Sequence, residues 1–148
     1  MTKIYFDVCC YNRPFDDLAQ VKVRLETEAI LSVFNKTCDN NAFLIYSSPA
    51  VDFEINQIKD SNKKNLVQAF LSSVKAHHLD FDNEISLKAK ELELHNIKYM
   101  DALHIAFCVF HGIDYMLTTD KILLNLVSRT DLAVKVLNPI EFVMEVLQ

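Results

Sequence analysis

Short apolar runs alternate along the chain with longer stretches in which apolar residues recur every three or four positions. The short runs predict buried strands, and the longer stretches predict helices. The predicted strands cover residues 3–6, 42–46, 79–81, 115–118 and 133–137. The predicted helices cover residues 18–34, 49–58, 65–75 and 99–110, a segment around Ala89 and Leu92, a segment around Ile122 and Leu126, and the residues from Pro139 onward.

The residues at the element boundaries support this assignment. Asp16 and Asp17 are suited to cap the helix that follows them, and Ser48-Pro49 places a capping hydroxyl before a proline at the first helical position. Gly112 follows the apolar helix at 99–110 and fits a left-handed C-terminal cap. Because no hairpin signal joins any two strands, the alternation predicts a parallel sheet covered by helices. Residues 1–148 show no linker or repeat and predict one α/β domain.

The chain has 148 residues but only one glycine, Gly112. Average usage would give about ten glycines at this length. Gly-rich phosphate cradles, dinucleotide fingerprints and glycine-flanked nucleophile elbows need close backbone approach or positive φ, so this count excludes all three. Any phosphate chemistry must therefore use metal ions or charged side chains.

Hydropathy and cysteine spacing favour a reduced, cytoplasmic protein without a membrane span. No apolar run approaches the roughly 20 residues that a span needs, and Asp7 interrupts the region where a signal peptide would be apolar. The four cysteines form no C-x-x-C pair and have poor zinc or disulfide spacing; they are Cys9, Cys10, Cys38 and Cys108. The net charge of -5 argues against a broad polyanion-binding surface, although it is compatible with a local basic rim.

Four acids are placed where a parallel sheet binds its ligands. Asp7 and Asp120 directly follow predicted strands, Glu54 lies in the helix after the second strand, and Asp101 opens the buried helix. Ligands bind beyond the carboxyl ends of such strands, so the four carboxylates can converge at one edge. Clustered carboxylates repel one another, and a hard divalent cation such as Mg²⁺ or Mn²⁺ relieves that repulsion. A carboxylate-held ion can polarise a phosphodiester and activate a water.

Each of these acids also has a purely structural interpretation. Asp7 can be a strand-end turn residue, and Asp120 can be the N-cap of the next helix. Glu54 can be a solvated helix residue. Asp101 can cap or form an ion pair, but an aspartate in an apolar helix needs some partner. Only their joint placement favours a metal site.

Further polar residues are secondary candidates. His104 lies at i+3 from Asp101, on the same helix face, where it can orient the carboxylate, touch substrate, or simply be a hydrogen-bonded core residue. Arg13 follows Asp7 by six residues and can reach a phosphate bidentately. His77-His78 is interpreted as a solvated helix end. The remaining lysine candidates for nucleic-acid contact, which a solvated face would equally explain, are Lys59, Lys63, Lys64 and Lys121.

Four segments match the pattern of a known family. They are Ile4–Cys10, an apolar strand closed by aspartate; Ser48–Glu54, a strand-end serine followed by glutamate; Asp101–Ala106, an aspartate with small residues in a buried helix; and Met116–Asp120, a Thr-x-Asp strand end. On these segments the chain resembles, essentially end to end, the PIN-domain nucleases, which include the VapC-type toxins of toxin–antitoxin pairs. The last two segments, at this spacing, are the specific part of the resemblance.

The resemblance implies a PIN-like three-layer α/β/α sandwich with a mainly parallel, doubly wound sheet. It also implies Mg²⁺- or Mn²⁺-dependent cleavage of phosphodiesters, usually RNA, to 5′-phosphate and 3′-hydroxyl products. Asp7, Glu54, Asp101 and Asp120 would hold the metal ion, and Thr118 would support them through a hydrogen bond. Family precedent further suggests a homodimer and an antitoxin partner.

One position departs from the family pattern. Cys9 stands where the family often has Ser, Thr or Asn two residues after the first aspartate, and a thiol is a weaker hydrogen-bond partner. Since all four acids are present, the leading hypothesis is a metal-dependent endoribonuclease. The alternatives are a non-catalytic PIN-fold module that binds RNA or protein, and a DNA nuclease that shares the acid cluster.

Overall fold

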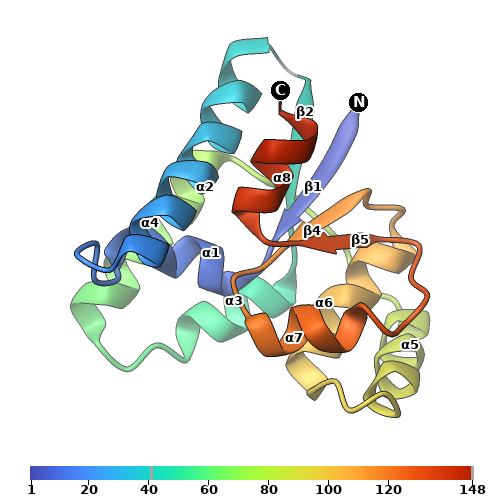
Figure 1. Ribbon diagram of the computed structural model, residues 1–148. Coiled ribbons are helices and arrows are strands. Elements are labelled where there is room, and N and C mark those ends of the chain that lie inside the picture. Colours follow the sequence, from blue (N-terminus) through green and yellow to red (C-terminus); the bar gives the residue numbers. More distant parts are fainter. Residues whose placement is uncertain (41, 148) are drawn as a thin grey trace.

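Five parallel strands form the centre of the structure, a computed structural model that describes residues 1–40 and 42–147 (Figure 1). The strands are β1 (Thr2–Phe6), β2 (Phe43–Ser47), β3 (His77–His78), β4 (Tyr115–Leu117) and β5 (Lys135–Leu137). Their order across the sheet is β3-β2-β1-β4-β5, and every neighbouring pair is parallel. The chain moves to one side of β1 for β2 and β3 and then returns to the other side for β4 and β5, so the sheet is doubly wound.

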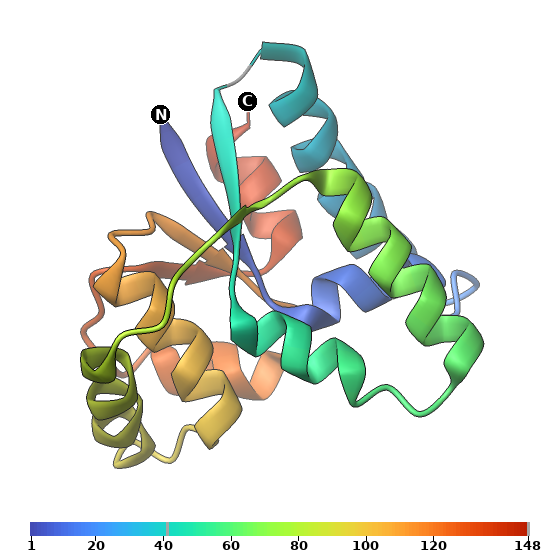
Figure 2. The same ribbon diagram turned by 180° about the vertical axis from the view of Figure 1, so that it is seen from behind.

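Helices cover both faces of this sheet. They are α1 (Val8–Asn12), the short 3-10 helix η1 (Arg13–Phe15), α2 (Val21–Asn40), α3 (Pro49–Asn56), α4 (Ser61–Val74), α5 (Asn83–Glu93), α6 (Tyr99–Phe110), α7 (Lys121–Val127) and α8 (Pro139–Val146). The pair α2 and α8 packs on one face, and the pair α5 and α6 packs on the face seen from behind in Figure 2. Since parallel crossovers are right-handed, connections that run to opposite sides of β1 place their helices on opposite faces. The predicted α/β/α sandwich is confirmed.

The central strand and α6 form the deepest part of the core. Ile4, Tyr5 and Phe6 of β1 are fully buried, which explains why this strand is a continuous apolar run instead of an alternating one. The predicted apolar helix at 99–110 is confirmed as α6, and it buries residues along most of its circumference, among them Phe107. Within the described residues, none of the helices combines the length and apolar character of a membrane span. Cys9, Cys10 and Cys108 are free thiols, while the side chain of Cys38 lies outside the described part of the chain.

Two predicted helix boundaries agree with the structure through their caps. The Ser48 side chain accepts a hydrogen bond from the backbone N–H of Ala50 and starts α3 ahead of Pro49. Gly112 has a φ of 67° directly after α6, in the left-handed region that glycine favours.

Asp120 caps α7 by accepting a hydrogen bond from the N–H of Leu123. The structural interpretation of Asp120 is therefore also correct.

The strand predicted at residues 79–81 is wrong. The edge strand is β3, at His77–His78, which the sequence analysis had assigned to a helix end. Leu79 turns into the core instead, and the ring of Phe81 packs against the ring of Phe107 on α6 with centroids 6.3 Å apart. The pattern alone cannot show whether a short apolar run is a strand or a loop that packs on a helix. Here it is a loop, and its apolar side chains pack in the core and against α6.

The predicted start of α2 is also wrong. The helix begins at Val21, because residues 13–20 form η1 and a turn in which the Asp17 carboxylate accepts a hydrogen bond from the N–H of Ala19. Asp16 pairs with Arg13 and Lys63 instead of capping. Other boundaries differ as well. The helix α2 continues to Asn40, past its predicted end at residue 34, and β5 begins two residues later than predicted, at Lys135. The helix α3 ends at Asn56, before Ile58, and α4 begins four residues earlier than predicted, at residue 61. The short helix α1 was not predicted from the sequence.

Candidate functional site

The candidate site lies where β1 and β4 end side by side. The N–H of Asp7 donates to the carbonyl of Leu117 over 2.9 Å, and the N–H of Thr118 donates to the carbonyl of Leu137 over 3.0 Å. These bonds continue the parallel ladder past the last strand residues and bring Asp7 beside Thr118. Because the strand order reverses on either side of β1, this is the position at which open α/β sheets form a ligand crevice.

Hydrogen bonds fix the carboxylate of Asp7. Its Oδ1 accepts from the N–H of Val8 over 2.8 Å, which makes Asp7 the N-cap of α1. Its Oδ2 accepts from the hydroxyl of Thr118 over 2.8 Å. The Cys9 thiol lies 3.6 Å from the same oxygen and 3.4 Å from Oγ1 of Thr118. Thr118 thus hydrogen-bonds the Asp7 carboxylate, and Cys9 contacts the same oxygen at the longer distance typical of sulfur.

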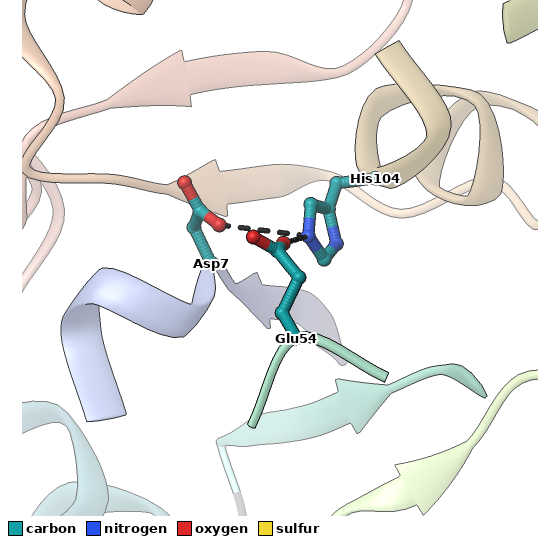
Figure 3. A group of neighbouring side chains, drawn as sticks. All are labelled: Asp7, Glu54 and His104. Carbon is teal, nitrogen blue, oxygen red and sulfur yellow. Dashed lines mark hydrogen bonds and ion pairs between the residues drawn. The ribbon is translucent and has the colours of Figure 1, made fainter. Parts of the chain in front are cut away.

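Glu54 and His104 reach the same place from two helices. Glu54 comes from α3, after β2, and His104 comes from α6, and both side chains point toward Asp7 (Figure 3). Nε2 of His104 contacts Oε1 of Glu54 and lies 3.7 Å from Oδ1 of Asp7. One ligand atom from each of Asp7, Glu54 and His104 lies within 4.8 Å of the other two. Two carboxylates and one imidazole at this separation are a donor set that fits a divalent cation.

Buried hydrogen bonds through Tyr5 and Ser48 fix the ring of His104 on the side away from Glu54. Nδ1 lies 2.5 Å from the hydroxyl of Tyr5, which lies 2.7 Å from Oγ of Ser48. Burial raises the pKa of Tyr5 well above its ordinary value, so the phenol stays neutral and can hydrogen-bond on both sides. Tyr5 stands two residues before Asp7, so alternation along β1 puts both side chains on one face. Tyr5 was not among the predicted site residues, although its spacing from Asp7 is visible in the sequence.

Charge at the site favours the protonated form of His104. Burial lowers the pKa of the imidazole, but the hydrogen bond to Glu54 and the negative charges of Asp7, Glu54 and Asp101 outweigh burial, so the pKa is raised overall. In the cationic form both ring N–H groups have acceptors, Glu54 at Nε2 and the Tyr5 oxygen at Nδ1. When no cation is bound, the acidic cluster therefore favours positive charge on the imidazole of His104.

Asp101 and Asp120 stand outside the tight three-residue group. Desolvation, together with the charges of Asp7 and Asp120, raises the pKa of the Asp101 carboxyl to about 6. Burial is the largest cause of this shift, and the neighbouring carboxylates add to it. Asp120 is exposed, and its N–H donates to Oγ1 of Thr118 over 3.2 Å. The structure thus gathers Asp7, Glu54 and His104 closely, and it places the charges of Asp101 and Asp120 near them.

Arg13 has strong partners outside this cluster. Its Nε and Nη2 both lie 2.9 Å from Oε1 of Glu26, which is fully buried, and its Nη1 lies 3.1 Å from Oδ2 of Asp16. The other Glu26 oxygen accepts from the amide of Asn138 over 2.6 Å. This network joins η1, α2 and the start of α8. Glu26 was not among the predicted residues, although it is an acid at helical spacing among the apolar residues of α2.

Comparisons with known proteins place the chain in a family. The sequence model described as "PIN domain" matches residues 23–128. The chain belongs to the PIN domain family. This match includes Glu54, Asp101, His104 and Asp120, whereas Asp7 precedes it. A comparison with curated protein sequences finds no match.

Solved structures support the same fold for this PIN domain. A chain in the crystal structure of VapBC2 from Rickettsia felis, bound to a DNA fragment from their promoter, superposes with a TM-score of 0.61. The similarity covers 93% of this chain and 98% of that chain at 13% sequence identity. At this identity the comparison concerns the fold alone. It extends the likeness to residues before and after the segment that the family model matches.

Proposed function

We propose that this PIN domain is a metal-dependent endoribonuclease that hydrolyses RNA phosphodiester bonds. The observation that carries the proposal is the convergence of Asp7 and Glu54 within 4.8 Å at the carboxyl end of β1. The raised pKa of Asp101, about 6, supports it, because unpaired carboxylates are kept together at a cost that a bound cation removes. PIN domains are generally nucleases, which favours this chemistry over other uses of an acidic crevice.

Asp7, Glu54, Asp101 and Asp120 would hold Mg²⁺ or Mn²⁺. When bound, such an ion polarises a phosphodiester and activates a water. Thr118 would keep the Asp7 carboxylate turned into the crevice through its 2.8 Å hydrogen bond. Glu54 is partly exposed, with 31% of its side chain accessible, so it is also suited to position a water.

Basic residues beside the crevice would contact the RNA backbone. Lys22 and Lys121 line one hollow together with Thr119 and the acids Glu26 and Glu141, next to the strand end that carries Asp120. Lysine ammonium groups bind phosphate as point charges and give binding that weakens with salt. Arg13 would join them through Nη1, whose present partner Asp16 is only half-buried. Its other nitrogens would stay with the buried Glu26.

The proposal extends to partners and location. The fold similarity to a chain of the VapBC2 structure supports an antitoxin protein as a partner of this chain. Family precedent supports a homodimer, and the free thiols of Cys9, Cys10 and Cys108 support a cytoplasmic location. Light scattering of the purified protein tests the dimer, and co-expression with the product of the neighbouring gene tests the antitoxin.

The test of the enzyme is cleavage of RNA by the purified protein with Mg²⁺ or Mn²⁺. We expect cleavage that EDTA abolishes and that Asp101→Asn reduces by at least a hundredfold. Asp131→Asn is the matched control, because it removes the same charge from an exposed position ahead of β5. Equal cleavage by Asp101→Asn and wild type would overturn the assignment. Preferential cleavage of DNA in a competition assay would replace RNA as the substrate.

A further inference from the structure

We propose that His104 is itself a ligand of the metal ion, so that the site combines carboxylates with an imidazole and prefers a first-row transition-metal ion to Mg²⁺. The inference rests on the metal site of the proposed function. It goes beyond the four acids, because the sequence pattern assigned only carboxylates to the ion. It rests on three observations: the direction of Nε2, the hydrogen bond between Nδ1 and the Tyr5 hydroxyl, and the chemistry of the donor set.

The first ground is the placement of Nε2. This nitrogen contacts Oε1 of Glu54 and lies 3.7 Å from Oδ1 of Asp7. Two donors of one ion lie at most about 4.2 Å apart, twice a metal–ligand bond of about 2.1 Å. Both separations satisfy that limit. The ring in Figure 3 directs Nε2 toward the two carboxylates, and an ion bound by all three groups would replace the close contact between Nε2 and Oε1 of Glu54.

The second ground is the hold on the other ring nitrogen. Metal-binding histidines almost always have their second nitrogen fixed by a hydrogen bond, which sets the tautomer and the ring orientation. Here the Tyr5 hydroxyl lies 2.5 Å from Nδ1, and Ser48 lies 2.7 Å from that hydroxyl. His104, Tyr5 and Ser48 are all fully buried. The Tyr5 oxygen can accept from Nδ1–H, which leaves the Nε2 lone pair for an ion.

The third ground is ligand chemistry. Mg²⁺ prefers an all-oxygen shell that keeps several waters, whereas imidazole suits transition-metal ions. A site with Asp7, Glu54 and His104 therefore favours ions such as Mn²⁺, Fe²⁺, Co²⁺ or Zn²⁺. An alternative is that His104 only positions Glu54 through a hydrogen bond. That alternative predicts no contact between nitrogen and the ion and equal effects of a His104 variant on Mg²⁺ and Mn²⁺.

Pulsed EPR of the full-length protein with bound Mn²⁺ distinguishes a His104 that binds the ion from a His104 that only positions Glu54. We expect a ¹⁴N coupling to the Mn²⁺ in the wild-type protein and its loss in His104→Gln. Glutamine keeps an amide that can donate to Glu54 but lacks the imidazole nitrogen. His78→Gln is the control, because His78 is half-exposed on β3 and pairs with Asp52 instead of the site; it should keep the coupling. Bound Mn²⁺ without ¹⁴N coupling, or coupling that persists in His104→Gln, would overturn the inference.

Metal titrations give a second readout, and a second variant keeps the inference testable if the first one does not fold. We expect wild type to bind Mn²⁺ at least tenfold more tightly than Mg²⁺, and His104→Gln to lose that difference. If His104→Gln does not fold, Tyr5→Phe keeps the imidazole while releasing Nδ1, and its Mn²⁺ affinity should fall by about tenfold. Unchanged Mn²⁺ affinity in Tyr5→Phe would contradict the role of the buried hydrogen bonds through Tyr5.

RNA cleavage, measured in parallel, separates this inference from the proposed function. Cleavage by a protein whose Mn²⁺ shows no ¹⁴N coupling would overturn the histidine ligand alone. A ¹⁴N coupling without any cleavage would overturn the nuclease alone. Failure to bind Mn²⁺ at all would overturn both.

Discussion

The hydroxyl of Thr118 donates a 2.8 Å hydrogen bond to Oδ2 of Asp7, across 111 residues of sequence. Both residues lie just past the ends of adjacent parallel strands, and both are buried. The same hydroxyl oxygen accepts from the N–H of Asp120. One threonine therefore links the aspartate that follows β1 to the aspartate that follows β4.

Removing that hydroxyl should weaken both the fold and the metal site. Thr118→Val keeps the side-chain volume but leaves Oδ2 of Asp7 and the N–H of Asp120 without this partner. We expect a loss of about 1–3 kcal/mol in the free energy of unfolding and about a tenfold loss in Mn²⁺ affinity. Urea unfolding and calorimetric titration measure the two effects. Thr118→Ser retains the hydroxyl and should stay close to wild type; equal losses in both variants would show that the methyl group matters instead.

The raised pKa of Asp101 should appear in the pH dependence of stability. Its folded-state pKa is about 6, above the ordinary value of 3.8. The carboxyl therefore contributes stability that is full below about pH 4 and is lost as pH rises through about 6. In EDTA, we expect the unfolding free energy of wild type, relative to Asp101→Asn, to be lower at pH 7.5 than at pH 5. A difference that does not change with pH would contradict the shared-charge environment of this carboxyl.

Metal binding should stabilise the folded protein by mass action. At a Mn²⁺ concentration about a hundred times its Kd, the gain is about 2.7 kcal/mol, which corresponds to a rise of about 5–10 °C in Tm for a domain of this size. Differential scanning fluorimetry measures it. Asp7→Asn lacks the charge of the most buried carboxylate of the cluster, so its Tm should rise far less on addition of Mn²⁺. An unchanged Tm of wild type at millimolar Mn²⁺ would count against a preformed site.

Arg13 should be important for stability because Glu26 depends on it. Glu26 is fully buried and bonded by Arg13 and Asn138. Breaking a buried pair by removing one partner costs about 3–5 kcal/mol, so Arg13→Met should destabilise by roughly that amount in urea unfolding. Arg13→Lys keeps the positive charge but lacks the planar guanidinium group, and it should lose less unfolding free energy than Arg13→Met. If Arg13→Met is as stable as wild type but binds RNA more weakly, phosphate contact is its main role.

Substitution of Gly112 should cost what its left-handed backbone conformation costs and no more. A Cβ atom there would meet no atom within 4 Å, so for alanine only the φ of 67° opposes the substitution. We expect Gly112→Ala to cost about 1–2 kcal/mol in unfolding free energy and Gly112→Asn to cost less, since Asn visits this region more readily. Equal costs in thermal unfolding would indicate that side-chain contacts, and not φ, limit the position.

Much of the fold could be predicted because local chemistry specifies it. The continuous apolar run at Ile4–Phe6 marked a strand buried on both faces, and Ser48-Pro49 marked the start of a helix whose cap the structure confirms. The length and apolar character of α6 followed from its sequence in the same way. The strand predicted at 79–81 failed because its apolar residues cover α6, and periodicity does not report which surface a side chain meets.

The sequence by itself determined the alternation of strands and helices, the four acids near strand ends and the exclusion of glycine-built phosphate sites. These follow from side-chain chemistry and from spacing within single elements. Only the tertiary structure decided that His104 faces Glu54, that Tyr5 holds its ring and that Arg13 is bound to Glu26. Those contacts join residues of different elements, and strand register and helix packing set them, which no local period encodes.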